Sequence, residues 1–98
     1  MCGARVGGRS LDGVDTGAEA VIEGVVRAGG SPVAGAYVRL LDTGGEFTAE
    51  VPTDADGAFR LFARPGRWTV RVLAPGREPA QRAVVADTGA VATLDVDV

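Results

Sequence analysis

The segment Thr53 to Phe59 (Thr-Asp-Ala-Asp-Gly-Ala-Phe) constrains the fold of this chain more than any other. It places two aspartates and a glycine between stretches in which apolar and polar residues alternate. Asp side chains accept hydrogen bonds from nearby backbone amides, and Gly adopts the positive φ that a tight reversal needs. Alternation with a period of two is typical of half-buried strands. The segment therefore predicts a hairpin turn between two strands.

Similar β-prone segments, separated by turns rich in Gly and Pro, fill most of the chain, and no helical periodicity competes with them. Seven strands are predicted, at residues 21–27, 36–41, 47–51, 59–63, 68–73, 81–86 and 91–98. Seven short strands in 98 residues predict an all-β fold, a seven-stranded antiparallel Greek-key β-sandwich, with an open barrel as the alternative.

Strand parity predicts which side chains face the core. We expect Trp68 at the centre of that core, because it is the largest apolar side chain at an inward position. The inward set is Ile22, Val26, Val38, Leu40, Phe47, Val51, Phe59, Leu61, Trp68, Val70, Val72, Leu94 and Val96.

The first nineteen residues differ from the rest in composition. They contain five glycines and few apolar side chains, so they have little to bury against the entropy cost of ordering. We predict a flexible Gly-rich arm at residues 1–19 and one sandwich domain at residues 20–98.

Composition weighs against enzyme chemistry. The chain has no His, Lys or Asn, and all ten basic side chains are Arg, which does not act as a general base at neutral pH. Without imidazole, Ser-His and Cys-His pairs and His-containing metal sites are excluded. We therefore expect a protein that is no enzyme and that takes no cofactor.

Charge and cysteine content bear on partners and location. A net charge of -3 lacks the basic surface that favours nucleic acid or an anionic membrane, so neither is expected as a partner. A single cysteine, Cys2, allows no internal disulfide, and no apolar stretch reads as a signal peptide or membrane helix. These features predict a cytoplasmic protein.

Three segments, 30–40, 53–59 and 65–72, together resemble the carboxypeptidase regulatory-like, or prealbumin-like (transthyretin-like), sandwich family. Segments 21–26, 38–42 and 46–51, with the opening Met-Cys-Gly, resemble more narrowly a small high-GC bacterial family of unknown function. Its members are often encoded beside thiosulfate sulfurtransferases. The resemblance implies the sandwich fold and suggests a thiosulfate sulfurtransferase as a partner.

The same resemblance excludes two activities of related sandwiches. Adhesin domains with internal isopeptide bonds require a Lys amine, and this chain has no Lys. Transthyretin-like hydrolases have the same predicted architecture, but they use histidines and a C-terminal Tyr-Arg-Gly-Ser signature. This chain has no His and ends in Leu-Asp-Val-Asp-Val.

Cys2 is the candidate for sulfur chemistry. Removal of Met1 would place a positively charged amino group beside the thiol, and a neighbouring positive charge favours the thiolate. A sulfurtransferase could then load persulfide onto Cys2 at the end of the arm. The alternative is an incidental thiol.

Asp54 and Asp56 are weak candidates for a divalent cation, because Asp-x-Asp-Gly begins like a calcium loop. The acidic residue that closes such a loop is missing, since position 63 is Ala. Turn capping explains both aspartates, and we expect no metal.

The residues at the outward positions of the predicted strands are less polar than a face in contact with water should be. They include Tyr37, Leu41, Phe62 and Leu73 among charged residues, and these four form a candidate interaction face for a protein partner or a homodimer. The alternatives are scattered surface residues or a cover by the N-terminal arm. Aromatic stacking on carbohydrate is disfavoured, because three of the five aromatics have inward parity.

Two functions follow from these features. The first is a non-catalytic accessory or protein-interaction module, and the second is a sulfur carrier that acts through Cys2. The substitution Cys2→Ser separates them, because only the sulfur carrier requires the thiol.

Overall fold

The computed structural model of the protein describes residues 20–98. Those residues form nine strands and no helix, so none of their segments is a helix that could cross a membrane. The strands are β1 (Ala20–Ala28), β2 (Ser31–Pro32), β3 (Tyr37–Leu41), β4 (Phe47–Pro52), β5 (Ala58–Ala63), β6 (Gly66–Leu73), β7 (Ala80–Ala86), β8 (Val91–Thr93) and β9 (Val96–Asp97).

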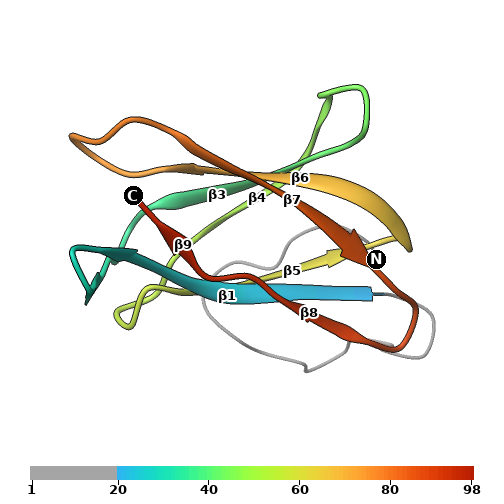
Figure 1. Ribbon diagram of the computed structural model, residues 1–98, viewed down its shortest axis with the longest axis horizontal. Helices are drawn as coiled ribbons and strands as arrows, with labels where there is room; N and C mark the ends of the chain where they lie inside the picture. The colour runs from blue at the N-terminus through green and yellow to red at the C-terminus, as the bar shows by residue number, and fades with distance from the viewer. Residues whose placement is uncertain (1–19) are drawn as a thin grey trace.

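The strands form two sheets packed face to face (Figure 1). One sheet has the order β4-β3-β6-β7 and is antiparallel throughout. In the other, β1 pairs with β2 and β5 in antiparallel fashion and with β8 and β9 in parallel. The predicted all-β sandwich is confirmed. The predicted strand number of seven and the fully antiparallel arrangement are wrong, because the described residues form nine strands and two of them run parallel to β1.

Gly24 lies beside the point at which the last predicted strand, 91–98, is divided into β8 and β9. A Cβ atom at position 24 would lie 1.6 Å from the Leu94 carbonyl oxygen, so only Gly allows the backbone to approach this closely. The Leu94 amide donates to the Glu23 carbonyl at 2.8 Å, and the Val25 amide donates to Asp95 Oδ1 at 3.1 Å. The C-terminal segment therefore stays bonded to β1 while its regular pairing is interrupted.

The core lies between the sheets and is formed by alternate residues of nearly every strand. Phe59 is the largest side chain that is fully buried. The parity prediction is confirmed for Ile22, Val26, Val38, Leu40, Val51, Phe59, Leu61, Val70, Val72 and Val96, and Leu94 is partly buried against them.

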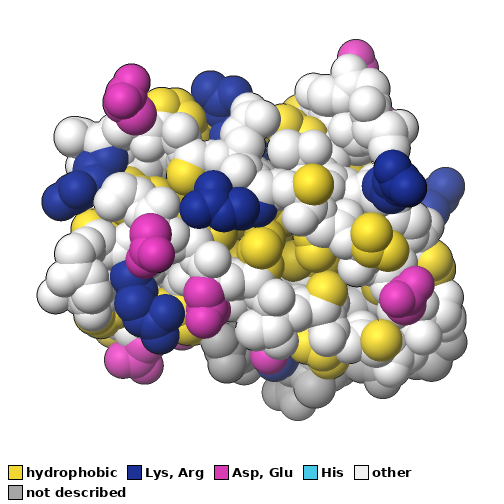
Figure 2. All heavy atoms as spheres, in the orientation of Figure 1, with side chains coloured by type: hydrophobic (Ala, Val, Ile, Leu, Met, Phe, Trp, Pro, Cys, Tyr) yellow, Lys and Arg dark blue, Asp and Glu magenta, His cyan; other side chains and the backbone are white. Residues whose placement is uncertain are grey.

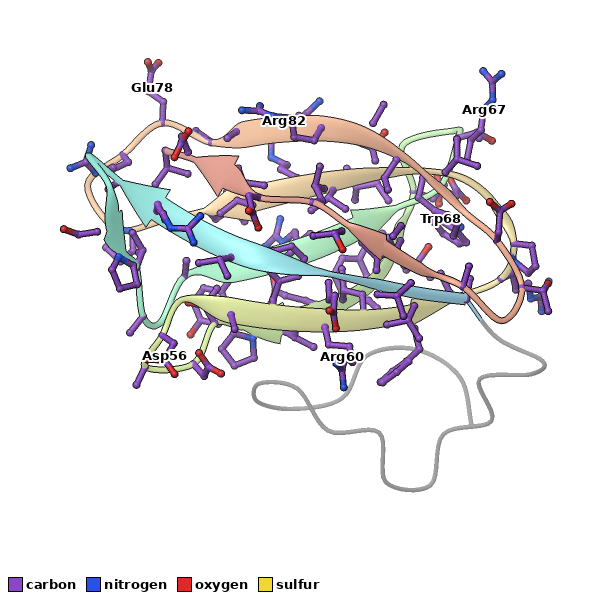
Figure 3. The ribbon with its side chains drawn as sticks, turned by 60° about the horizontal axis from the view of Figure 1, so that its bottom comes forward. Asp56, Arg60, Arg67, Trp68, Glu78 and Arg82 are labelled. Atoms are coloured by element: carbon purple, nitrogen blue, oxygen red, sulfur yellow. The ribbon has the colours of Figure 1, made fainter. Side chains whose placement is uncertain are left out.

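Trp68 is not the centre of the core, which corrects the sequence prediction. It is partly buried near one end of the sandwich (Figure 3), and its indole N–H donates to the Arg64 carbonyl at 2.9 Å. The pairing of β6 with β3 ends at Thr69, opposite Leu41. Trp68 therefore lies beyond the end of β3 and covers only the margin of the core.

Phe47 is also misplaced by the parity argument. A register shift between Leu40 and Leu41 pairs Leu40 with Ala49 but Leu41 with Phe47. Because of this β-bulge, Phe47 at the start of β4 lies on the outer face of the sheet and not on the core face, and it is 62% exposed. Alternation counted along one strand gives no indication of a bulge, so this position could not be predicted.

The Asp-x-Asp-Gly turn connects the two layers and is not a hairpin, contrary to the prediction. The strand before it, β4, pairs with β3, whereas the strand after it, β5, pairs with β1 in the other sheet. The local chemistry is as predicted, because Gly57 has a φ of 74° and the Asp54 carboxylate accepts turn amides. The turn residues determine that the chain reverses its direction, whereas strand pairing determines the sheet in which the chain continues.

Candidate functional site

The sheet β4-β3-β6-β7 has one face against the core and one face directed away from it. Val38 and Leu40 of β3 are fully buried, so Tyr37, Arg39 and Leu41 belong to the opposite face. Cross-strand pairing extends this face to β4, β6 and β7. We call it the four-stranded outer face; it consists of Tyr37, Arg39, Leu41, Phe47, Glu50, Pro52, Arg67, Thr69, Arg71, Leu73, Gln81, Ala83 and Val85.

Three of the four residues predicted for an interaction face lie together here. Tyr37 is directly opposite Leu73, and Leu41 lies further along β3 on the same side. Phe62 does not belong to this face, because it lies on β5 in the other sheet, opposite Val21. Phe62 is only 3% exposed, so the predicted set is corrected by its removal.

Exposed large apolar side chains are more frequent on the four-stranded outer face than elsewhere in residues 20–98. Of the four that are most exposed among residues 20–98, three belong to it: Tyr37 (51%), Phe47 (62%) and Val85 (57%). The fourth, Val91 on β8, is 53% exposed and belongs to the other sheet. Single exposed apolar residues are ordinary, whereas several on one sheet face are typical of a contact surface.

A polar row crosses the middle of the same face. Arg39 pairs with Glu50 on one side and with Arg71 on the other, and Arg71 pairs with Gln81. Arg39 Nε donates to Glu50 Oε2 at 2.6 Å, and Arg71 Nη1 donates to Gln81 Oε1 at 2.8 Å. Two guanidinium groups therefore lie on adjacent strands, and one carboxylate is bound to the first.

The charge balance of this face is opposite to that of the whole chain. It carries Arg39, Arg67 and Arg71 but only one acidic side chain, Glu50, whereas the chain has a net charge of -3. Arg67 extends outward at one end of the sandwich (Figure 3). Within residues 20–98, no carboxylate lies within ion-pair distance of Arg71.

A second apolar region lies at the margin of the sandwich. Figure 2 shows apolar atoms in a band between the layers, along the line where β7 faces β8 and β9. Val84 of β7 and Leu94, which lies between β8 and β9, are partly buried against the core. Arg82 pairs with Val70 and so occupies an inward position on the edge strand β7. The Arg82 side chain is exposed, and a charged residue on an edge strand opposes the addition of a further strand, so we favour the sheet face over this edge.

Asp54 and Asp56, the weak metal candidates, have different environments. Asp54 Oδ1 accepts the amides of Asp56 and Ala58, both at 2.9 Å, so this oxygen holds the turn. Asp56 is exposed at the tip (Figure 3). In the part of the chain that the structure describes, no three His, Cys, Asp or Glu side chains form a group that could hold a metal ion.

Cys2 lies outside the described residues, and so does the whole predicted arm at residues 1–19.

Sequence reasoning missed Thr53, a polar residue that is buried. Its hydroxyl donates to the Val33 carbonyl at 2.6 Å and accepts the Ala36 amide at 3.0 Å. Thr53 thereby ties the loop before β3 to the end of β4. A buried hydroxyl with two backbone partners has a structural role. Its only signal in the sequence is its place just before the Asp-x-Asp-Gly turn.

The relatives of this chain carry no functional description. The profile of a family described as a protein of unknown function (DUF1416) matches residues 2–98. The chain belongs to the DUF1416 family. An uncharacterized protein of Mycolicibacterium smegmatis is 51% identical to this DUF1416 protein over 88 residues, 88% of this chain and 96% of the relative. An uncharacterized protein of Mycobacterium tuberculosis is 52% identical over 75 residues, 74% of this chain and 75% of the relative.

Solved structures resemble this DUF1416 protein in fold alone. The dioxygenase domain of a dioxygenase carbohydrate-binding protein fusion from Streptomyces sp. SirexAA-E has a TM-score of 0.65 and 21% identity, covering 96% of this chain and 89% of that domain. BcpA, the major pilin subunit of Bacillus cereus, has a TM-score of 0.67 and 17% identity, covering 81% of this chain and 28% of the pilin. Identities this low transfer neither dioxygenase nor pilin activity.

Proposed function

We propose that this DUF1416 protein is a non-catalytic protein-interaction module whose four-stranded outer face binds a protein partner. The exposure of Tyr37, Phe47 and Val85 on one sheet face is the observation that carries this proposal. Aromatic residues and Arg are enriched in protein interfaces, and this face combines both. A rigid sheet also presents its side chains with little entropy loss on binding, which favours recognition.

Several finer features of this proposal remain predictions. They are a thiosulfate sulfurtransferase as the partner, cytoplasmic residence, and kinship with carboxypeptidase regulatory-like or prealbumin-like domains. Neither the family description nor the uncharacterized relatives test any of these three features.

Site-specific photo-cross-linking in the native host tests the proposal. A p-benzoylphenylalanine residue replaces Tyr37 in one variant and Val91 in a matched control. The two positions are exposed to nearly the same degree, 51% and 53%, but lie on different sheets. We expect a covalent adduct of defined mass from position 37 and none above background from position 91.

The mass of the adduct identifies the occupant of the face. An adduct of twice the chain mass would indicate the predicted homodimer, and any other mass a different protein. Equal labelling from positions 37 and 91, or none from either, would contradict a binding role for this face. Substitution of Leu73 with Asp, which places a charge directly opposite Tyr37, should remove the adduct while the protein stays folded.

A further inference from the structure

We propose that Arg39 and Arg71 form a receptor for a carboxylate, so that the partner of the four-stranded outer face is a different protein that docks an acidic segment onto it. This inference rests on the proposed function and specifies the chemistry of the partner. It starts from the register, which places Arg39 directly opposite Arg71 on the adjacent strands β3 and β6.

Like charges directly opposite each other in a sheet are destabilising, and opposed side chains have Cβ atoms only about 4.5–5.5 Å apart. Glu50 offsets this repulsion on one side only, because its carboxylate binds Arg39 Nε. Arg71 is bonded to the neutral amide of Gln81. The row therefore contains two positive charges and one negative charge, and one further carboxylate would balance it.

Both guanidinium groups retain donors for such a carboxylate. A guanidinium has several N–H donors in one plane, and each of these two uses one nitrogen in the described bonds. The Arg39 side chain is 44% exposed, so an approaching group can reach it. Arg–carboxylate bonds are stronger and more directional than neutral ones, which suits a receptor of this kind.

Apolar side chains beside the two arginines define the rest of the ligand. Tyr37 and Leu73 form a pair two residues along the strands on one side, and Leu41 lies two residues along on the other. A ligand that fits both kinds of surface carries an acidic side chain between apolar ones. A segment of protein has this composition, whereas an inorganic anion provides only the charge.

The test uses the isotope-labelled full chain and two short acetylated peptides. One peptide alternates Glu with Leu, and the other alternates Gln with Leu. NMR titration follows the Nε–H signals of Arg39 and Arg71 and the backbone amides around them. We expect the Glu peptide to shift these signals and the Gln peptide to bind at least tenfold more weakly. We expect Arg71→Gln to weaken binding of the Glu peptide about five- to tenfold.

Arg64→Gln is the matched control, because Arg64 is exposed in the turn between β5 and β6 and is not one of the residues that form this face. It should leave peptide binding unchanged. Equal binding of both peptides, no binding of either, or shifts centred away from Arg39 and Arg71 would overturn the proposal. It would also be overturned if sodium sulfate alone reproduced the shifts while the Glu peptide did not, because the site would then be one for small anions.

The cross-linking experiment separates this proposal from the proposed function. If position 37 captures a protein and Arg71→Gln leaves the yield of that adduct unchanged, the interaction module stands and the carboxylate receptor is wrong. A captured second copy of the same chain, lost in Arg71→Gln, would overturn the claim that the partner is a different protein.

Discussion

The outer faces of the two sheets carry the same two kinds of cross-strand pair, an aromatic with an aliphatic residue and an Arg with a Glu, but the pairs differ in exposure. On β1 and β5, Phe62 is opposite Val21 and Arg60 is opposite Glu23. On the four-stranded sheet, Tyr37 is opposite Leu73 and Arg39 is opposite Glu50. Phe62 is 3% exposed and Tyr37 51%. The exposed fractions of the ion-paired side chains are 12% and 16% for Arg60 and Glu23, but 44% and 29% for Arg39 and Glu50.

This contrast shows that an aromatic residue beside an Arg–Glu pair has no fixed role. Where the pair is buried, solvent screens it weakly and the aromatic removes its surface from water, so both contribute to stability. Where the pair is exposed, water screens the charges and the apolar area is still available for binding. We therefore assign stability to the β1–β5 face and recognition to the four-stranded outer face.

The largest expected effect compares the two aromatics. Phe62→Ala should lower the free energy of unfolding by about 3–5 kcal/mol, because it removes a buried aromatic. Tyr37→Ala should change it by no more than about 0.5–1 kcal/mol, as for most surface positions. Urea unfolding followed by the fluorescence of Trp68, the only tryptophan, measures both. Similar losses for the two variants would show that the difference in burial does not hold in solution.

The next effect compares the two ion pairs. Arg60 donates to Glu23 through both Nε and Nη2, and both side chains are largely buried. Glu23→Gln should therefore cost about 1.5–3 kcal/mol, the usual range for a hydrogen bond to a charged group. Glu50→Gln should cost only about 0.2–1 kcal/mol, because the Arg39–Glu50 pair is more exposed.

The same unfolding experiment, repeated at low and high salt, adds a second criterion to this comparison. Salt should reduce the contribution of Glu50 more than that of Glu23, since exposed pairs are screened and buried pairs much less so. If Glu50→Gln proved the more costly change, the assignment of stability to the β1–β5 face would be wrong.

The sequence was sufficient for most of the strands but not for the way in which they pair. Period-two alternation placed Ile22, Leu40, Phe59 and Val72 in the core, because residues two apart on a strand share a face. Which strands pair depends on contacts far apart in the chain. The parallel pairing of β8 and β9 with β1 therefore left no local signal except the small residue Gly24.

The residues of the candidate site could likewise be predicted only in part. Outward parity identified Tyr37, Leu41 and Leu73, but it equally selected Phe62, because parity distinguishes the two sides of one strand and not the two sheets. Phe47 was assigned to the core because a bulge is invisible to alternation. The opposition of Arg39 and Arg71 depends on the register between β3 and β6, which composition and spacing do not determine.

The smallest expected effect has the opposite sign. Arg71→Gln removes one of two like charges that face each other on the four-stranded outer face, so it should raise the free energy of unfolding by about 0.2–1 kcal/mol. The gain should shrink at about 1 M salt, where the screening length is only about 3 Å. Arg64→Gln, which changes the net charge equally, should show neither effect. A stability loss in Arg71→Gln would mean that the bond to Gln81 and the packing of the Arg71 stem outweigh the repulsion, and that this face holds no unbalanced charge for a partner to neutralise.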